Sequence, residues 1–404
     1  MKVEGFLKDV TGASRVTRAR HRLIDSGSPQ NLYSDPIRQL AQEIHPEKTR
    51  VRVTKVEDVS KTARKFTFEP ADGDILPPFQ AGQYVSLDLT IPGGNGRQTV
   101  TTRPFSICSA PFQARQGEKS FFELTIRNGR PGQGYASIWM YENTKVGSMF
   151  TAHLPFGQFF YEPLRDAKQV VALAGGSGIT PFYSMAQEIA HGTLDCDLTI
   201  LYGSVSSSDI ILKKQLEEVD SPRVRFVNVI SDEPDYPGEK GYLSADLIRK
   251  YTQGDPADGK TSYFVCGPLP MYRFVEGELT KLNVPKRRIR MEVFGAPRDI
   301  TQDPDYPARE AAVYHLTVHR GLEKTVIDAS SLEPLAVAME RAGIPNQTRC
   351  RSGACGYCRC KLLKGDVFVP AVGDGRRYAD KKFGYVHACS TYPLSDCEVQ
   401  IIIC

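Results

Sequence analysis

The sequence lacks long hydrophobic runs and has little excess of charge. None of its apolar runs approaches the roughly 18 residues that a membrane-spanning helix needs; one of the longest, at 170–174, has the length of a buried strand. The formal net charge of +4 makes no case for nucleic-acid binding. The N-terminus lacks the pattern of a secretory signal, and Glu4, Asp9 and Asp25 argue against a transit peptide despite the nearby arginines. A cytoplasmic protein without a transmembrane segment or a nucleic-acid partner is therefore expected.

Cysteine is scarce in the first three hundred residues, where Cys108, Cys196 and Cys266 occur singly. The rest of the ten cysteines lie between positions 350 and 404. A small disulfide-stabilised protein would distribute paired cysteines throughout its chain. Clustering at short spacings instead indicates a metal site, in a chain whose 404 residues are long enough for two to four domains.

Changes in pattern divide the chain into segments. Residues 1–48 have no strong strand pattern, and Ser34-Asp35-Pro36 ahead of apolar positions at helical spacing is typical of a helix start, so this segment is expected to be a helical extension. Residues 49–163 hold short alternating runs separated by Gly and Pro, which favours a closed antiparallel β-barrel with one helix near 135–141.

The second half of the chain changes pattern twice. Residues 164–298 alternate apolar strands with helices, which predicts a parallel sheet covered on both faces. Residues 299–312 are polar, contain prolines and lack periodicity, so a linker is expected there. Residues 313–404 begin with a hairpin-like pair and a helix and end with a strand. The sequence thus predicts a multidomain protein of α+β and α/β class.

The strongest motif is the cysteine pattern near the C-terminus. Cys350, Cys355 and Cys358 form C-x4-C-x2-C, and Cys389 supplies a fourth thiol further along. This is the ligand arrangement of plant-type [2Fe–2S] ferredoxins, and two glycines keep the loop free of side-chain bulk. A structural zinc site is the competing interpretation, but it usually has two C-x2-C pairs and this segment has one.

Residues 313–404 resemble the plant-type ferredoxin domain, which implies a β-grasp fold with the cluster near the surface. Cys360, Cys397 and Cys404 then fall outside the ligand set and are expected to be packing residues. Basic side chains surround the ligands, namely Arg349, Arg351, Arg359 and Lys361. An exposed basic rim would favour an acidic docking surface on a partner protein, and a merely solvated face is the alternative.

The run Arg-Pro-Phe-Ser at 103–106 resembles the R-x-Y/F-S/T flavin motif of the ferredoxin–NADP reductase superfamily. The resemblance implies that Arg103 meets a flavin phosphate, Phe105 packs on the isoalloxazine, and Ser106 hydrogen-bonds near the flavin N5. Gly134 and Ser137, at the start of the helix in the barrel, match the G-x-x-S element of the superfamily. Leu-Pro-Phe-Gly at 154–157 matches the P-x-G turn that ends its flavin domain.

A glycine-rich turn after the apolar strand at 169–175 matches the nicotinamide-nucleotide motif of the same superfamily, where backbone amides can approach a pyrophosphate. Its members are Gly175, Gly176, Gly178, Thr180 and Pro181. A later strand end matches the C-G-P-x-x-M element with Cys266, Gly267, Pro268 and Met271. The resemblance places Cys266 near the nicotinamide ring, and Glu292 and Phe294 in an element that returns toward the flavin. Ser106, Cys266 and Glu292 are therefore the candidates for contact with the reacting atoms.

The order of these motifs resembles the reductase components of oxygenases, such as those of phthalate dioxygenase and vanillate demethylase. NAD(P)H gives up two electrons as a hydride and an iron–sulfur cluster accepts one, so a flavin is needed between them. The resemblance implies an NAD(P)H-dependent electron-transfer oxidoreductase that supplies a partner redox protein, such as an oxygenase component. A redox sensor without sustained turnover is the alternative.

Two cofactor choices follow from single features. FAD is favoured over FMN because the helix start at 132–137 suits a pyrophosphate. Val205 stands where many relatives carry an arginine, which favours NADH over NADPH because one partner for a 2′-phosphate is lost. Nearby donors leave NADPH open, namely Ser206, Ser207, Lys213 and Lys214.

Overall fold

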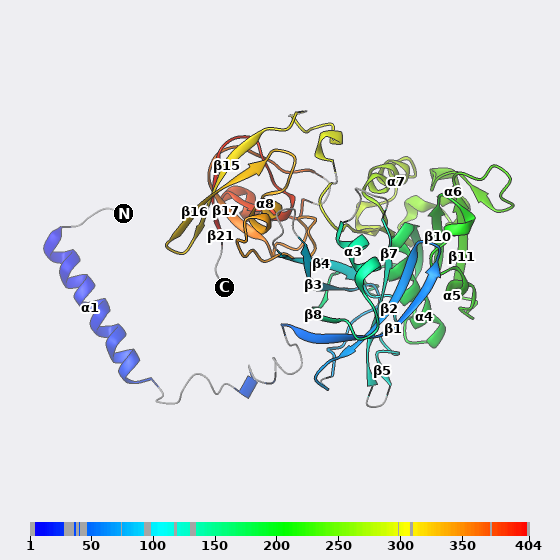
Figure 1. Ribbon diagram of the computed structural model, residues 1–404, viewed down its shortest axis with the longest axis horizontal. Helices are drawn as coiled ribbons and strands as arrows, with labels where there is room; N and C mark the ends of the chain where they lie inside the picture. The colour runs from blue at the N-terminus through cyan, green and yellow to red at the C-terminus, as the bar shows by residue number, and fades with distance from the viewer. Residues whose placement is uncertain are drawn as a thin grey trace. The chain divides into compact units, whose positions relative to one another are not determined.

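The computed structural model describes residues 5–27, 36–37, 40, 47–73, 75–92, 98–116, 119–129, 135–297, 299–307, 310–371 and 374–401. The chain divides into two compact units, Met1–Pro46 and Glu47–Cys404. The first unit contains the helix α1 (Phe6–Asp25) (Figure 1). The helix predicted to begin at Pro36 falls largely outside the described residues. Within the part of the chain that the structure describes, no helix combines the length and apolar character that crossing a membrane requires.

The second unit begins with a six-stranded antiparallel sheet in the order β4-β3-β8-β1-β2-β7. Its strands are β1 (Thr49–Ser60), β2 (Ala63–Pro70), β3 (Tyr84–Pro92), β4 (Gln98–Ser106), β7 (Phe122–Arg127) and β8 (Met149–Phe156). Side chains alternate between the two faces of a strand, so Val51 and Val53 of β1 are buried while Arg50 and Arg52 are exposed. The alternating apolar positions thus form the interior of the sheet.

The sheet closes into the predicted barrel just beyond β4. Ile107 pairs with Leu124 of β7, and the Cys108 N–H donates to the Glu123 carbonyl at 2.9 Å. The short hairpin β5 (Arg115–Gln116) and β6 (Lys119–Ser120) lies between β4 and β7 in the chain. The helix α3 (Tyr135–Asn143) adds two side chains to the barrel core, Ala136 and Met140.

The next sheet is parallel throughout, in the order β12-β11-β10-β9-β13-β14 (Figure 1). Its strands are β9 (Gln169–Gly175), β10 (Asp197–Ser204), β11 (Val224–Ile230), β12 (Glu239–Lys240), β13 (Thr261–Cys266) and β14 (Ile289–Glu292). The connecting helices are α4 (Thr180–His191), α5 (Lys213–Glu217), α6 (Ala245–Tyr251) and α7 (Leu269–Lys281). The chain crosses from β9 to β10 on one side and places β13 on the other, which creates a topological switch point beside β9.

Both faces of the parallel sheet are covered, as the sequence predicted. Val170 and Ala172 of β9 pack in one core with Phe182 of α4, whereas Val171 and Leu173 pack in another. That second core also contains residues of α6 and α7. The helix α5 is the shortest of the four connecting helices, because it begins at Lys213 and ends at Glu217.

The C-terminal domain has a mixed sheet in the order β16-β15-β21-β17-β19. Its strands are β15 (Val313–Arg320), β16 (Glu323–Ser330), β17 (Arg359–Lys364), β19 (Tyr385–His387) and β21 (Cys397–Ile401). A two-stranded pair, β18 (Val367–Phe368) and β20 (Tyr392–Pro393), and the helices α8 (Leu335–Arg341) and α9 (Tyr378–Lys382) complete it. The apolar face of α8 packs on the sheet through Leu335, Ala338 and Met339.

The segment between the last two sheets is more ordered than its polar composition suggested. Tyr306 is 3% exposed, packs beside Tyr392, and donates its hydroxyl to the Ser331 carbonyl at 2.6 Å. Asp303 accepts from Arg273 of α7 at 2.6 Å. The middle of this connection is therefore anchored to both neighbouring domains, through one carboxylate and one aromatic side chain that show no periodicity in the sequence.

Candidate functional site

The four cysteines of the predicted ligand set lie on two segments of the C-terminal domain. Cys350, Cys355 and Cys358 lie on the loop between α8 and β17, which we call the ligand loop (residues 348–358), and Cys389 lies in the 3-10 turn η7 (Ala388–Ser390). The Cys355 N–H donates to the Cys350 sulfur at 3.4 Å, and the Cys389 N–H donates to the Cys358 sulfur at 3.4 Å. The ligand loop and η7 therefore bring the four thiols together, with Cys389 interacting with both Cys350 and Cys358.

The four thiols form one donor set, and its pattern bears on the kind of metal centre that it could hold. A two-iron cluster takes two thiolates on each iron, and C-x4-C-x2-C with a distant fourth thiol is its plant-type ligand pattern. A structural zinc site usually has two C-x2-C pairs, and this donor set has one. Interaction with the Cys355 and Cys389 thiols also holds the pKa of Cys350 below its ordinary value. The donor set fits a [2Fe–2S] cluster better than a zinc ion.

The ligand loop keeps its shape through glycines and one histidine. Gly353 and Gly356 have φ of 85° and 74°, in the left-handed region that favours glycine. His387 at the end of β19 bonds the Gly353 carbonyl through Nδ1. The other two described cysteines of this domain, Cys360 and Cys397, are 1% and 3% exposed and belong to the core of the sheet, whereas Cys404 lies outside the described residues.

In the barrel, the predicted flavin residues lie at the end of β4. The half-buried Arg103 donates to the Thr102 carbonyl at 3.4 Å. Its burial, and to a smaller extent the positive charge of the nearby Arg351, lowers the pKa of Arg103. A half-buried cation without a carboxylate partner among the described residues suits an anion such as a phosphate. Phe105 packs against the barrel core, and the Ser106 hydroxyl is buried.

The remaining barrel motifs are only partly described. Ser137 lies in the first turn of α3, and Gly134 lies outside the described residues. Gly157, directly after β8, has a φ of 107°, and a Cβ there would lie 3.0 Å from the Tyr84 ring and 3.2 Å from Glu292 Oε1. The P-x-G turn therefore touches both β3 and the end of β14, where only a glycine fits.

The glycine-rich turn of the parallel sheet packs directly on the end of β13. It forms the 3-10 turn η2 (Gly176–Ile179), and α4 follows with Thr180 and Pro181 in its first turn. A Cβ at Gly178 would lie 2.1 Å from the Cys266 carbonyl oxygen, so these two predicted motifs require a glycine at their contact. Gly175 and Gly267 enclose the Met271 sulfur in the same way, each with a Cβ position 2.5 Å from it.

The three candidates for contact with the reacting atoms lie close together: Cys266 pairs with Glu292 across β13 and β14, and a tyrosine joins Glu292 to the residue after Cys266. The Ser106 hydroxyl donates to Glu292 Oε2 at 3.3 Å. The Tyr272 hydroxyl donates to the Glu292 carbonyl and accepts from the Gly267 N–H at 3.1 Å. Burial raises the pKa values of Glu292 and Cys266 well above their ordinary values. Tyr272 gave no signal in the sequence, because its role depends on the crossing of α7 and β14.

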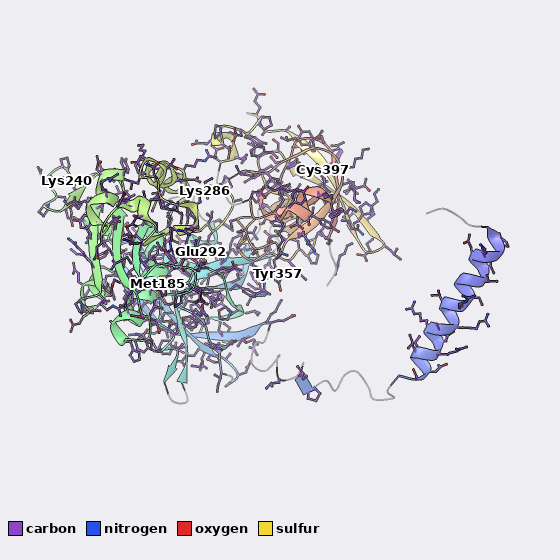
Figure 2. All side chains as sticks on the ribbon, turned by 180° about the vertical axis from the view of Figure 1, so that it is seen from behind. Met185, Lys240, Lys286, Glu292, Tyr357 and Cys397 are labelled. Carbon is purple, nitrogen blue, oxygen red and sulfur yellow. The ribbon has the colours of Figure 1, made fainter. Side chains whose placement is uncertain are left out.

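The barrel and the parallel-sheet domain meet through buried contacts on both sides. Met185 of α4 and Glu292 are labelled in Figure 2; both belong to the parallel-sheet domain and lie against Gly82 and Gly157 of the barrel. A Cβ at Gly82 would lie 2.6 Å from Met185 Cε, so the barrel backbone passes directly against α4. Arg127 at the end of β7 donates to Asp209 at 2.6 Å across the same boundary.

The ligand loop is tied to this junction by backbone and aromatic contacts. The Gly295 N–H donates to the Cys350 carbonyl at 3.2 Å. Phe294 packs edge-on against Tyr84 of β3, with the ring centroids 5.1 Å apart. The barrel, the end of β14 and the ligand loop therefore meet within one cluster of side chains.

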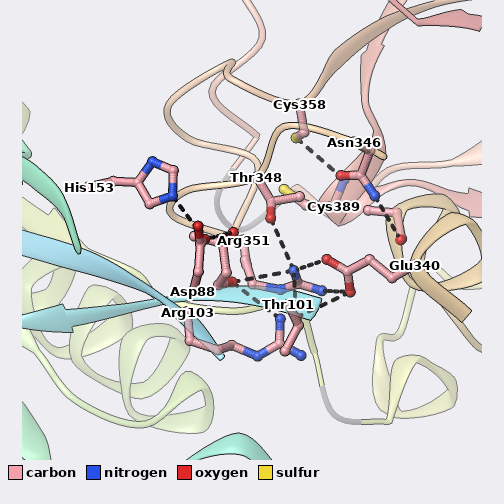
Figure 3. A network of polar contacts seen from close by, with 12 residues as sticks. Asp88, Thr101, Arg103, His153, Glu340, Asn346, Thr348, Arg351, Cys358 and Cys389 are labelled. Atoms are coloured by element: carbon pink, nitrogen blue, oxygen red, sulfur yellow. Dashed lines mark hydrogen bonds and ion pairs between the residues drawn. The ribbon is translucent and has the colours of Figure 1, made fainter. Parts of the chain in front are cut away.

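A buried ion pair joins the ligand loop to the barrel strand that carries the flavin motif. Figure 3 shows Arg351 between Glu340 of α8 and Thr101 of β4. Arg351 bonds Glu340 through both terminal nitrogens, at 2.5 and 2.9 Å, and reaches the Thr101 hydroxyl and the Thr102 carbonyl at 3.4 Å each. Its φ of 57° is unusual for a residue with a side chain, and the contacts hold it there.

Comparison with known proteins agrees with this geometry. Residues 172–277 match the model for the oxidoreductase NAD-binding domain, and residues 319–394 match the model for the 2Fe-2S iron-sulfur cluster binding domain. The solved structure of phthalate dioxygenase reductase has the same fold, with a TM-score of 0.62, 20% identity, and coverage of 88% of this chain and 98% of that chain. The chain is therefore an oxidoreductase with a nicotinamide-nucleotide-binding domain and a C-terminal [2Fe–2S] domain. The resemblance found in the sequence is thereby confirmed.

Named relatives of this reductase support the same class. The chain is 28% identical to the glycine betaine monooxygenase reductase subunit of Chromohalobacter salexigens, over 87% of this chain and 94% of that protein. It is 28% identical to the ferredoxin reductase component of 3-ketosteroid-9-alpha-monooxygenase of Mycobacterium tuberculosis, over 86% and 93%. It is also 27% identical to the NADH oxidoreductase HCR of Escherichia coli, over 79% and 88%. The reductase is an electron-transfer oxidoreductase, as expected.

The structure corrects one part of the predicted surface of this reductase. Of the four basic residues around the ligands, Arg349 and Arg351 are 5% and 6% exposed and point into the protein. Arg359 and Lys361 are exposed, and Arg359 pairs with Asp380 at 3.1 Å. The prediction of a continuous exposed basic rim is therefore wrong, because two of its arginines join the ferredoxin domain to the barrel.

Proposed function

We propose that this protein is an NADH-dependent reductase that passes single electrons to the oxygenase component of a multicomponent system. The observation that carries this proposal is the meeting of three motifs at one junction. Ser106 of the flavin motif bonds Glu292 at 3.3 Å, and Gly295, three residues later, bonds Cys350 of the ligand loop at 3.2 Å. A flavin held at Ser106 would accept a hydride from the nicotinamide side and release electrons singly toward the cluster side.

For the metal centre, we infer that Cys350 and Cys355 bind one iron and Cys358 and Cys389 bind the other. Both pairs are already linked by an N–H to sulfur contact at 3.4 Å. Among these thiols, Cys355 is exposed and the other three are buried. The edge of the site near Cys355 therefore suits transfer to an external protein, and the buried edge near Cys350 suits transfer from the barrel.

For the flavin, we infer that Arg103 binds a phosphate, Phe105 supports the ring system, and Ser106 hydrogen-bonds near the reacting nitrogen. Gly134 and Ser137 would bind the phosphates at the N-terminus of α3, and Phe294 would cover the ring from the nucleotide side. FAD is preferred to FMN on this basis. Mass analysis of the extracted flavin decides between the two, because only FAD carries an adenosine group.

For the nicotinamide nucleotide, we infer that the turn at 175–181 binds the pyrophosphate and that residues 266–268 lie beside the nicotinamide. The end of β10 is the adenosine side of the switch point. There Glu233 accepts from the Ser206 hydroxyl at 2.7 Å and from the Ser207 N–H at 2.8 Å. These two hydrogen bonds hold the pKa of Glu233 below its ordinary value, and the bond from Ser206 has the larger effect. The carboxylate is therefore ionised near neutral pH.

The Glu233 carboxylate supports NADH as the donor. It already accepts hydrogen bonds from the Ser206 hydroxyl and the Ser207 N–H, two donors that could otherwise have bound a 2′-phosphate. Its negative charge would also repel a phosphate. Lys213 and Lys214 pair with acidic residues one turn along α5, at 3.9 and 3.8 Å. With Val205 in place of an arginine, the described residues leave the 2′-phosphate without a dedicated cation.

We place the reductase in the cytoplasm and infer that its acceptor is a protein with an acidic docking surface. Arg359 and Lys361 are the exposed cations closest in sequence to Cys355, and they support this choice. The oxygenase assignment follows the names of the relatives, among which oxygenase reductase subunits recur.

The proposal is tested with the purified holoprotein under anaerobic conditions. NADH should bleach the flavin absorbance and generate the electron paramagnetic resonance signal of a reduced [2Fe–2S] cluster. Steady-state reduction of ferricyanide should survive Cys355→Ala, whereas reduction of cytochrome c should be lost. Cys397→Ala is the matched control, because it removes a buried cysteine outside the ligand set and should retain both activities.

Two results would contradict the proposal. Anaerobically isolated protein that contains neither iron nor flavin would remove its chemical basis. Protein that carries both cofactors but turns over neither acceptor would instead indicate a redox sensor.

A further inference from the structure

Arg349 is a buried charged residue that none of the predicted motifs explains. Its side chain is 5% exposed. Its guanidinium carbon lies 3.9 Å from the ring centroid of Phe156 and 4.0 Å from that of Tyr357. Phe156 ends β8 of the barrel, whereas Tyr357 belongs to the ligand loop and is labelled in Figure 2. Arg349 therefore stacks between the barrel and the ligand loop, immediately before the ligand Cys350.

The hydrogen bonding of this guanidinium is incomplete. Nη2 donates to the Tyr357 hydroxyl at 2.8 Å, but Nε and Nη1 are buried without an acceptor among the described residues. Its neighbour Arg351 is equally buried, and there Glu340 supplies the opposite charge. Burying a cation is strongly unfavourable unless an anion completes the site. The arrangement around Arg349 thus lacks one anionic component.

We propose that Arg349 is a positioning residue for electron transfer. Its guanidinium supplies the counter-charge for the iron–sulfur cluster and holds the cluster against the barrel. The inference rests on the proposed function, because the missing anion is the cluster with its four thiolates. A fixed cation beside the cluster favours the more negative, reduced form, so it raises the reduction potential. Because Phe156 belongs to the barrel, the position of this charge depends on the docking of the ferredoxin domain.

The flavin is the other anionic cofactor expected at this junction. Phe156 directly precedes Gly157, which touches Tyr84 and Glu292, so the guanidinium could act on the flavin potential instead. Both potentials therefore need to be measured in the same sample. The sequence position next to Cys350 and the bond to Tyr357 favour the cluster.

The experiment is a redox titration of the holoprotein with Arg349→Gln. The cluster is followed by the electron paramagnetic resonance of its reduced form, and the flavin by its visible absorbance. We expect the equilibrium constant for one-electron reduction of the cluster to fall about tenfold, which is about 59 mV for a one-electron couple. The flavin potential should change much less.

Arg359→Gln is the matched control. Arg359 follows the ligand Cys358 as Arg349 precedes Cys350, but it is exposed and pairs with Asp380 at 3.1 Å. Water and salt screen an exposed charge, so the cluster potential should shift far less in this variant.

A cluster potential that moves no more in Arg349→Gln than in Arg359→Gln would overturn the inference. A shift of the flavin potential alone would overturn it as well. If the Arg349→Gln protein is isolated without a cluster, the titration is repeated with Phe156→Leu. The Phe156→Leu variant retains the charge of Arg349 and loses the stacking from the barrel. A lowered cluster potential is then expected, and an unchanged one refutes the inference. Absence of the cluster from the unaltered protein would be a failure of the proposed function instead.

Discussion

Removing the carboxylate of Glu340 is the change that should most weaken the docking of the ferredoxin domain. The side chains of Arg351 and Glu340 are 7% and 11% exposed, and they form two hydrogen bonds of 2.5 and 2.9 Å. Removing one member of a buried ion pair typically costs about 3–5 kcal/mol, because the other charge stays buried without a partner. Thr101 and Thr102 still lie near the guanidinium, so we expect about 3 kcal/mol for Glu340→Gln.

Thermal unfolding followed by the loss of cluster absorbance measures this effect. For a domain of about 60–100 residues, 1 kcal/mol shifts the midpoint by about 4–8 °C, so a decrease of about 12–24 °C is expected. Arg341→Gln is the control on the same helix, since its ion pair with Glu333 is also 2.5 Å long but its side chain is 52% exposed. An exposed pair of this kind contributes at most about 1 kcal/mol.

The double variant Arg351→Met with Glu340→Leu completes the test. Removing both charges leaves neither one buried alone, so this variant should be clearly more stable than Glu340→Gln. The reasoning is refuted if Glu340→Gln shifts the midpoint no more than Arg341→Gln, or if the double variant is no more stable than the single one.

Three further changes test the cofactor sites. Glu233→Gln should raise kcat/KM for NADPH relative to NADH several-fold, because the carboxylate no longer repels a 2′-phosphate. An unchanged ratio in steady-state assays would remove the reason for preferring NADH. Arg103→Ala should lose flavin on dialysis while the cluster spectrum stays intact, and full flavin retention would contradict the phosphate assignment. Gly178→Ala places a Cβ 2.1 Å from the Cys266 carbonyl oxygen. We therefore expect kcat/KM for NADH to fall at least about tenfold while both cofactors are retained. Kinetics like those of the unaltered protein would show that the glycine-rich turn can move away from Cys266 freely.

The cofactor chemistry could be read from local sequence because its determinants are short. Three of the four proposed ligands lie within nine consecutive positions, and Cys350, Cys355 and Cys358 need one loop rather than a fold to approach one another. The glycine-rich turn follows its strand directly, and the Arg103 motif lies on a single strand. The period of two along the strands likewise predicted the barrel. The alternation of apolar strands with helices predicted the parallel sheet, and alternate residues of β9 enter the cores on its two faces.

Contacts between distant residues were decided only by the tertiary structure. The sequence predicted that Arg349 and Arg351 would be exposed, because charge alone does not tell whether a domain surface will dock against a barrel. Arg351 contacts Thr101, which lies 250 positions away from it in the chain, and Arg349 stacks on Phe156 of the barrel. Glu233 and Tyr272 also carried no signal, since each acts through a partner that only the packing of strands and helices brings near. Local spacing thus determined which cofactors the chain can bind, whereas tertiary packing decided how their sites are joined and how each buried charge is compensated.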